Sequence, residues 1–282
     1  LAVWWLLGVS LAPLREVVAA VRSRDAETLA PLPLAGLPAE LEPLGRSLNA
    51  LLERLRSSFD AQRAFVADAA HELRSPLTAL KLQLELVRSA SSEAARAQAL
   101  RELGAGTDRM QRLIEQLLAL ARAEPGGAEA APADTDVTET VRQATADTVP
   151  LAAAHGVELE LDAPRPQPAR ADAAALRILA RNLIDNAVRY SGRGGRVQVQ
   201  VGGDEAAVVV RVDDSGPGIP VAERSRVFDR FYRRAGSETT GSGLGLAIVR
   251  AIAERHGAEV RLDDSPLGGL RVELRLPRRR PA

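Results

Sequence analysis

The stretch FVADAAHELRSPLTAL, residues 65–80, decides the fold of the first half of the chain. Around it, apolar or small residues recur about every 3.5 positions from Leu48 to Val87, and only Gln62 interrupts the series. This spacing is that of a coiled-coil seam. It predicts a long helix that packs against other helices along most of its length.

A second helix is predicted after a break at residues 89–92. The same spacing of apolar or small residues returns there, at Leu100, Leu103, Thr107, Met110, Ile114, Leu117 and Ala121. Two helices of this kind form a hairpin, and each hairpin leaves an apolar stripe that two helices cannot cover. The sequence therefore predicts a homodimer that closes a four-helix bundle. The alternative is that the rest of the same chain covers the stripe.

The N-terminal 60 residues have a different pattern. Residues 1–14 carry no charge, but a bilayer needs about 20 apolar residues, so we expect residues 1–12 to be the end of a truncated transmembrane helix. A buried helix of a soluble protein is the alternative. Residues 13–60 read as a linker with a helix, a proline-rich connector and a second helix, because prolines at such spacings break a continuous helix.

The hairpin domain is expected over residues 61–125 and is followed by a linker, residues 126–134, rich in Pro, Gly and Ala. Residues 135–282 mix predicted helices with alternating or apolar strands. The helices are expected at about 137–153, 172–190 and 245–256, and the strands at 157–161, 196–201, 207–213, 259–263 and 270–276. The fold class is therefore multidomain, with a helical hairpin followed by an α/β sandwich.

Composition excludes several kinds of function. Lys plus Arg and Asp plus Glu both number 37, so no net charge attracts nucleic acid, and aromatic residues make up only 3% of the chain. We therefore expect no direct binding to nucleic acid. The chain has no cysteine, which excludes thiol nucleophiles and Cys-ligated metals.

His71 is the candidate nucleophile. It follows seam position Ala70, so its ring should flank the seam and reach solvent, where neutral imidazole is a nucleophile near physiological pH. Glu72 could orient one ring nitrogen and accept its proton. Pro76 should bend the helix one turn later. A zinc site of the HExxH type is excluded, because its second histidine would stand where Ser75 does.

Three motifs in the second half suggest a nucleotide site. In RNLIDNAVRY, Asn182 and Asn186 share a helical face, so Asn186 could offer an oxygen to Mg²⁺ while Arg189 meets phosphate. The strand VVVRVDD ends in two acids that could accept an exocyclic amino proton, and SGPGIP follows it. The glycine-rich GSGLGLAIV, residues 241–249, leads into a helix whose free N–H groups suit phosphates. Between the last two, residues 228–241 read as a mobile lid with Arg233 near phosphate.

Taken in order, HELRSP, NLIDNA, DDSGPGI, FDRFYR and GSGLGL resemble the motifs of the sensor histidine kinases of two-component signalling. The resemblance covers nearly the whole chain. It implies a HAMP linker over residues 13–60, a phosphoacceptor hairpin of the HisKA type, and a catalytic ATP-binding domain shared with the GHKL ATPases.

The resemblance also assigns roles to residues. It makes His71 the phosphorylated nucleophile and Glu72 its acid/base partner, with Asn186 as the Mg²⁺ ligand and Asp214 as the acceptor of the adenine amino group. Ser75 becomes a candidate residue for phosphatase activity. The other ATP-binding residues implied are Asn182, Arg189, Tyr190, Gly216, Gly218, Arg233, Gly241, Gly243, Gly245 and Leu246.

The expected function is therefore autophosphorylation of His71 from Mg-ATP, followed by transfer of the phosphoryl group to an aspartate of a response regulator receiver domain. The resemblance implies a homodimer anchored in the inner (cytoplasmic) membrane by a preceding transmembrane helix, with its kinase domains in the cytoplasm. Two alternatives remain open: a GHKL-type ATPase, and a nucleotide-binding signalling scaffold, neither of which phosphorylates histidine.

Overall fold

The computed structural model describes residues 30–31, 42–123, 132–233 and 242–278. The expected membrane segment, residues 1–12, the first part of the expected linker domain and Gly241 lie outside these ranges. Within the described ranges, no helix is both long enough and apolar enough to cross a bilayer. The chain divides into two compact units, Leu1–Glu72 and Leu73–Ala282, with the boundary inside a helix.

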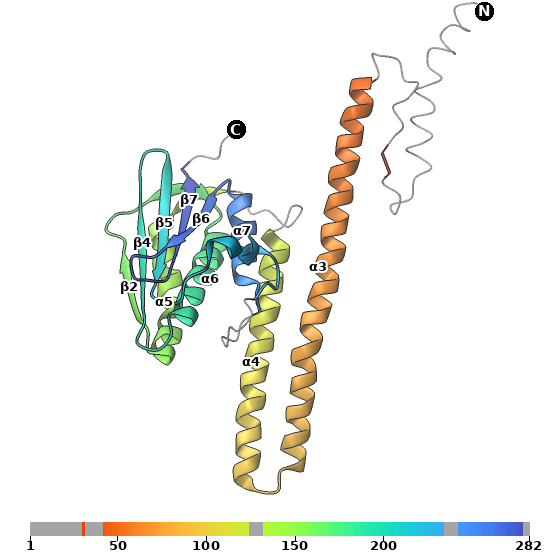
Figure 1. Cartoon of the computed structure of the whole chain (residues 1–282), viewed down its shortest axis with the longest axis vertical. Helices are drawn as coiled ribbons and strands as arrows, with labels where there is room; N and C mark the ends of the chain where they lie inside the picture. Colours follow the sequence, from red (N-terminus) through yellow and green to blue (C-terminus); the bar gives the residue numbers. More distant parts are fainter. Residues whose placement is uncertain (1–29, 32–41, 124–131, 234–241, 279–282) are drawn as a thin grey trace, which may run out of the picture. The chain divides into compact units, whose positions relative to one another are not determined.

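Helix α3, Glu42–Ser89, carries the coiled-coil pattern and continues through Pro76 (Figure 1). It also runs without a break from the expected linker domain into the hairpin domain. A short turn leads to α4, Glu93–Ala123, whose first turn is capped by the hydroxyl of Ser92, which accepts the N–H of Ala95 at 3.2 Å. The expected helix–turn–helix is therefore confirmed.

Burial along α4 confirms half of the expected seam, because Leu117 is buried and Leu103 and Met110 are half-buried. The other half is displaced by one position. Within one chain the buried residues include Ala99, Gly106, Leu113 and Leu120, while Leu100 and Ile114 remain exposed. A Cβ on Gly106 would lie 2.8 Å from a methyl carbon of Leu80 in α3, so a larger residue there would need this leucine side chain to shift. Two neighbouring faces of α4 are thus apolar, and one of them is left uncovered by this chain.

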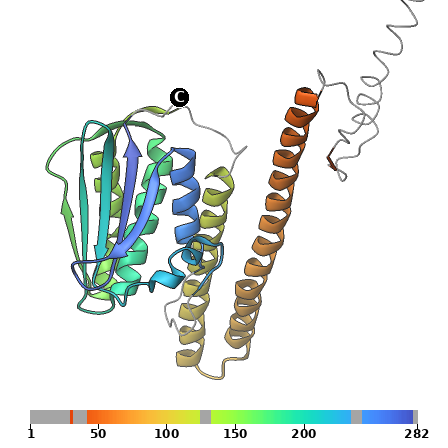
Figure 2. The ribbon, with the colours of Figure 1, turned by 45° about the horizontal axis from the view of Figure 1, so that its top comes forward.

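The second half is an α/β sandwich. A five-stranded sheet has the order β2-β4-β5-β7-β6, in which β2 and β4 are parallel and the other neighbours antiparallel. Figures 1 and 2 show helices α5, α6 and α7 together on one face of this sheet. The helices span Val137–His155, Ala173–Ser191 and Gly245–Arg255, and the strands span Glu158–Asp162, Arg196–Gly203, Ala207–Asp214, Glu259–Asp264 and Leu270–Pro277.

The core lies between the helices and the inner face of the sheet. Alternate residues of β4 and β7 are buried, as in Val197, Val199 and Val201, because successive side chains of a strand point to opposite faces. From the helices, Leu183 and Ile184 of α6 and Ile248 of α7 are almost fully buried as well. Burial of this apolar surface stabilises the domain that carries the nucleotide motifs.

Two short strands were not expected from the sequence. Strand β1, Ala133–Asp136, pairs antiparallel with β3, Pro168–Ala171. Strand β1 therefore begins inside the segment 126–134 expected to be a linker, two residues before the expected start of the domain. The pairing fixes the start of α5, where Asp136 accepts the N–H groups of Thr138 and Gln167 on one carboxylate oxygen, at 3.0 and 3.1 Å.

Candidate functional site

His71 lies on α3 with an exposed side chain, as its position next to the seam predicts. Glu72 is half-buried beside it, and the two side chains make no hydrogen bond to each other in this described helix. Ser75 is one turn further on and is also exposed. Solvent can therefore reach the imidazole, which a phosphate acceptor requires.

Asp214 is the best-defined polar group of the ATP-binding motifs. It ends β5 and is only 5% exposed. Its Oδ1 accepts the backbone N–H of Gly216 at 2.8 Å and that of Leu270 at 3.0 Å. Among the described residues, no donor contacts Oδ2, so one carboxylate oxygen is held by the backbone while the other remains able to accept a hydrogen bond from a ligand.

The pKa of Asp214 is raised above its ordinary value. Burial is the main cause, because it disfavours the charged carboxylate. The two backbone N–H groups lower the pKa, and the charge of the neighbouring Asp213 raises it again. The net result is a carboxylate that is less well solvated than an exposed one, and an amino group of a ligand would replace part of the missing solvation.

Glycines allow the backbone to close around Asp214. A Cβ on Gly269 would lie 2.1 Å from the Oδ1 of Asp214, and one on Gly216 would lie 2.5 Å from the carbonyl oxygen of Tyr190. Gly218 has a φ of +64°, a conformation that glycine adopts readily. Side chains at the first two positions would therefore displace either the carboxylate or the end of α6.

Asp213 has a different role from its neighbour. Its side chain points to the opposite face of the sheet, where it is fully buried and accepts two hydrogen bonds from Arg271, at 2.9 and 3.0 Å. Asp213 and Arg271 are directly opposite each other in the pairing of β5 with β7. The paired carboxylate raises the pKa of Arg271. Of the two adjacent acids, Asp214 is thus the one that keeps a carboxylate oxygen available to a ligand.

The side chain of Asn186, on α6, lies next to the N-terminus of α7. A Cβ on Gly245, the first residue of that helix, would lie 2.9 Å from the Nδ2 and 3.1 Å from the Oδ1 of Asn186. Glycine at this position therefore lets the amide approach the free N–H groups at the start of the helix. An oxygen of Asn186 suits a magnesium ion, and the positive end of the helix dipole suits the phosphates that accompany such an ion.

Asn182 faces a different partner. Its Nδ2 donates to the carbonyl of Ile178 at 2.8 Å, within α6 itself. Arg189 is half-buried near the end of the same helix, and Tyr190 and Arg233 are exposed. Leu246 is half-buried in the first turn of α7. The structure thus gathers Asn186, Gly243, Gly245 and Leu246 at one helix end and Asp214, Gly216 and Gly218 at the end of β5.

The described residues on either side of segment 234–241 lie close together. A Cβ on Gly243 would lie 2.7 Å from the carbonyl carbon of Phe231 and 2.9 Å from the carbonyl oxygen of Tyr232. Gly243 has a φ of +72°, and Phe231 has a φ of +59°, which is unusual for a residue with a side chain. Residues 234–241 between them lie outside the described ranges. The close approach brings the FDRFYR and GSGLGL motifs together.

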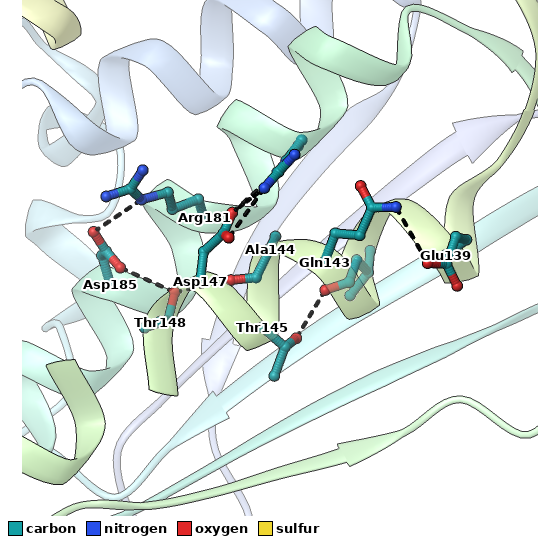
Figure 3. A network of polar contacts seen from close by, with 10 residues as sticks. Glu139, Gln143, Ala144, Thr145, Asp147, Thr148, Arg181 and Asp185 are labelled. Carbon is teal, nitrogen blue, oxygen red and sulfur yellow. Dashed lines mark hydrogen bonds and ion pairs between the residues drawn. The ribbon is translucent and has the colours of Figure 1, made fainter. Parts of the chain in front are cut away.

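A polar network behind the site holds α6 to α5 (Figure 3). Thr148 of α5 donates to Asp185 of α6 at 3.1 Å, and Arg181 lies 3.9 Å from the other oxygen of that carboxylate. Burial raises the pKa of Asp185, and Arg181, Thr148, Arg189 and Arg112 oppose the increase. Because Asp185 precedes Asn186, this network fixes the rotation of the helix that presents the amide.

Several of these contacts were missed in the sequence analysis. Asp214 is held by the backbone N–H groups of Gly269 and Leu270. Gly269 is the second of two adjacent glycines before the last strand, and this pair was a usable signal. The contact of Gln116 with Ser242 joins residues 126 positions apart in the chain. No local sequence pattern predicts such a contact. The residues described contain no cluster of three or more His, Cys, Asp or Glu side chains that could hold a metal.

Three family models match the chain. The His Kinase A (phospho-acceptor) domain matches residues 61–126, and the Histidine kinase-, DNA gyrase B-, and HSP90-like ATPase matches residues 171–280. The HAMP domain of the Sensor protein PhoQ-like type matches residues 11–57. The three matches follow the order of the domains expected from the motifs.

Curated relatives align over nearly the whole chain. Sensor protein QseC of Escherichia coli is 40% identical over 281 residues, which cover 95% of this chain and 60% of that protein. Sensor protein kinase PmrB of Pseudomonas aeruginosa is 35% identical over 295 residues, covering 99% of this chain and 59% of that protein. The chain thus spans about three fifths of the length of these relatives.

Among solved structures, full-length ShkA in complex with AMPPNP matches with a TM-score of 0.57 and 27% identity. The match covers 76% of this chain and 45% of ShkA. It extends beyond either domain alone, so it includes both the helical and the α/β parts.

Proposed function

Because this chain belongs to the sensor histidine kinases of two-component signalling, we propose that it transfers the γ-phosphoryl group of ATP to His71 and then to an aspartate of a response regulator. The observation that carries the proposal is that Asp214 keeps one carboxylate oxygen available at the end of β5, while Asn186 adjoins the N-terminus of α7. An adenine and a triphosphate need such a pair of sites, and an exposed imidazole is present in the same chain.

Adenine would be recognised by Asp214. Its Oδ1 is occupied by two backbone N–H groups, so Oδ2 is the oxygen that would accept the exocyclic amino proton. A buried carboxylate that gains a donor recovers solvation, and guanine would place a carbonyl oxygen where adenine has its amino group. Asp214 therefore favours adenine over guanine.

The phosphates would lie at the N-terminus of α7, where backbone N–H groups are free to donate. Arg189 and Arg233 would add positive charge. The Asn186 oxygen fits Mg²⁺, which usually takes one or two protein oxygens and completes its shell with phosphates and water. When bound, the ion neutralises charge that develops on the phosphates.

The transfer itself needs a nucleophile and a proton acceptor. One imidazole nitrogen of His71 would attack the γ-phosphorus, the bond from that phosphorus to the bridging oxygen of ADP would break, and Glu72 would receive the proton from the ring. In the second step the P–N bond would break as an aspartate oxygen of the receiver domain bonds to phosphorus. Ser75 is the candidate residue for dephosphorylation of the receiver domain, in which water would attack phosphorus and the bond from phosphorus to the aspartate oxygen would break.

The homodimer is part of the same proposal. Leu77 and Leu84 of α3 and Ile114 of α4 are all more than a third exposed, and they continue the predicted heptads. We assign this surface to a second copy of the chain, because sustained heptads match the spacing of partner helices. The membrane anchor belongs to the proposal as well, since the HAMP match, residues 11–57, begins at the end of the uncharged segment 1–14.

The test is incubation of the full chain with γ-labelled Mg-ATP, comparing the native protein with His71→Gln. We expect label that is lost in acid, survives alkali and is absent from the variant. ATP hydrolysis without such label would instead support a GHKL-type ATPase. Nucleotide binding without turnover would support a signalling scaffold.

A further inference from the structure

The glycine-rich loop makes a hydrogen bond to the hairpin. Ser242, the second residue of GSGLGL, donates its hydroxyl proton to Oε1 of Gln116 at 2.7 Å. Gln116 is half-buried on α4, and Ser242 is also half-buried. The bond therefore joins the helical domain directly to the loop to which we assign the phosphates.

The single hydroxyl proton of Ser242 is already engaged in this arrangement. A serine hydroxyl carries one proton and two acceptor lone pairs. The proton is used by Gln116, and one lone pair accepts the backbone N–H of Leu244 at 3.2 Å. Phosphate oxygens only accept hydrogen bonds, so a phosphate at this loop gains the Ser242 proton or the Leu244 N–H only when the existing hydrogen bond of that donor breaks.

Other contacts keep α4 beside the loop whether or not Gln116 is present. Helix α4 packs against α7, and Leu120 and Ala123 near its end are buried. Arg255 of α7 donates to the carbonyl of Arg122 at 3.0 Å and also pairs with Asp172 at the start of α6, at 2.7 Å. A change at Gln116 alone therefore alters the hydrogen bonding of Ser242 and leaves the packing of the helix in place.

We propose that Gln116 is a positioning residue for the glycine-rich loop and that it weakens triphosphate binding by competing for the hydroxyl proton of Ser242. The inference rests on the proposed function, in which this loop binds the phosphates of ATP. Its consequence is that nucleotide binding and contact of the loop with the hairpin oppose each other. ATP would break the hydrogen bond from Ser242 to Gln116, and that hydrogen bond would favour release of ATP.

The test measures the affinity of the full chain for ATP and for adenosine by calorimetry. Gln116→Ala frees the Ser242 proton, so it should bind ATP about fivefold more tightly, the usual range for one net hydrogen bond. Its affinity for adenosine should not change, since adenosine has no phosphate. Gln116→Glu keeps an acceptor and adds negative charge beside the phosphates, so it should bind ATP more weakly than the native chain.

Two further variants serve as controls. Gln111→Ala removes the same side chain from the exposed face of α4, where Gln111 donates to Glu115 at 3.1 Å, and it should leave ATP affinity unchanged. In a Ser242→Ala background, Gln116→Ala should have no further effect on ATP affinity, because the contested proton is already absent.

Unchanged or weaker ATP binding by Gln116→Ala would overturn the inference, and so would an equal gain for adenosine. The proposed function fails separately. If the native chain binds ATP and acquires label on His71 but Gln116→Ala gains no affinity, only the competition at Ser242 is wrong. If the native chain binds no ATP, both proposals are wrong.

Discussion

A Cβ added to Gly245 would lie 2.9 Å from Nδ2 and 3.1 Å from Oδ1 of Asn186, so the first residue of α7 and the amide of α6 occupy adjoining space. No residue with a Cβ fits at position 245 unless Asn186 moves. This relationship connects the loop that approaches phosphate to the residue assigned to magnesium, and it makes the glycine a condition for the site.

Gly245→Ala should therefore reduce affinity for Mg-ATP by about tenfold or more, because the displaced amide no longer meets the ion and the phosphates. The measurement is titration with Mg-ATP, and adenosine binding should change little. Gly104→Ala is the matched control. No heavy atom lies within 4 Å of a Cβ there, so affinity should be unaffected. Equal losses in both variants would remove the steric explanation.

Asp214→Asn should abolish adenine recognition. The amide would keep its oxygen on the N–H groups of Gly216 and Leu270 and turn its NH₂ toward the ligand, where two donors would meet. Affinity for ATP should fall about tenfold to a hundredfold, the range for a hydrogen bond to a charged group. Inorganic triphosphate, which has no adenine, should bind as well as before. Loss of triphosphate binding would indicate a general collapse of the site.

The same variant has a pH-dependent effect on stability. The pKa of Asp214 is raised in the folded chain, so ionisation of this carboxyl disfavours folding. Its favourable contribution is present below its ordinary pKa of 3.8 and is lost as the pH rises through the folded value. Asp214→Asn should thus be more stable than the native chain at pH 7, and the difference should shrink toward pH 4. Denaturant titrations at several pH values measure it, and a gain that grows on acidification would contradict the assignment.

Arg271→Met should destabilise the ATP-binding domain. It would leave the fully buried Asp213 carboxylate without its partner, which typically costs about 3 kcal/mol in the free energy of unfolding. The double variant Asp213→Asn with Arg271→Met should recover part of that loss, because the buried charge is then absent. Chemical denaturation of the four proteins forms the cycle. Additive effects of the two substitutions would show that the pair is not coupled.

Helix α3 runs without interruption from Glu42 to Ser89, so it connects the HAMP match to His71 in one element. Inserting one residue after Arg56 should rotate everything beyond it by about 100° relative to the preceding turn. We expect the basal labelling of His71 to persist and its regulation by the stimulus to be lost. Kinase assays in membranes with and without the insertion make the comparison, and unchanged regulation would refute transmission through the helix.

Much of the ATP-binding fold could be predicted because its helices and strands are strongly periodic. The alternating valines of β4 and the buried run of β5 were recognised in nearly their observed positions. Strands β1 and β3 were missed, since four residues such as ADTD show no alternation and owe their conformation to each other. The choice of Asp214 over Asp213 also followed from motif spacing.

Other features depend on tertiary contacts that no local pattern encodes. The expected seam of α4 included Leu100 and Ile114, yet one chain buries Ala99 and Leu113, because α4 turns one apolar face to this chain and keeps the neighbouring face exposed. The proposed dimer would use that second face. Likewise, the bond from Ser242 to Gln116 exists only once α4 and α7 are packed together.

The central claim is that a phosphoryl group reaches His71. Mass spectrometry of the chain after incubation with Mg-ATP, digested and analysed under alkaline conditions, tests it most directly. The account predicts a single phosphate on the peptide that contains His71, and none after substitution of His71 by Gln. A phosphate on another residue, or ATP consumed while the His71 peptide stays unmodified, would contradict it.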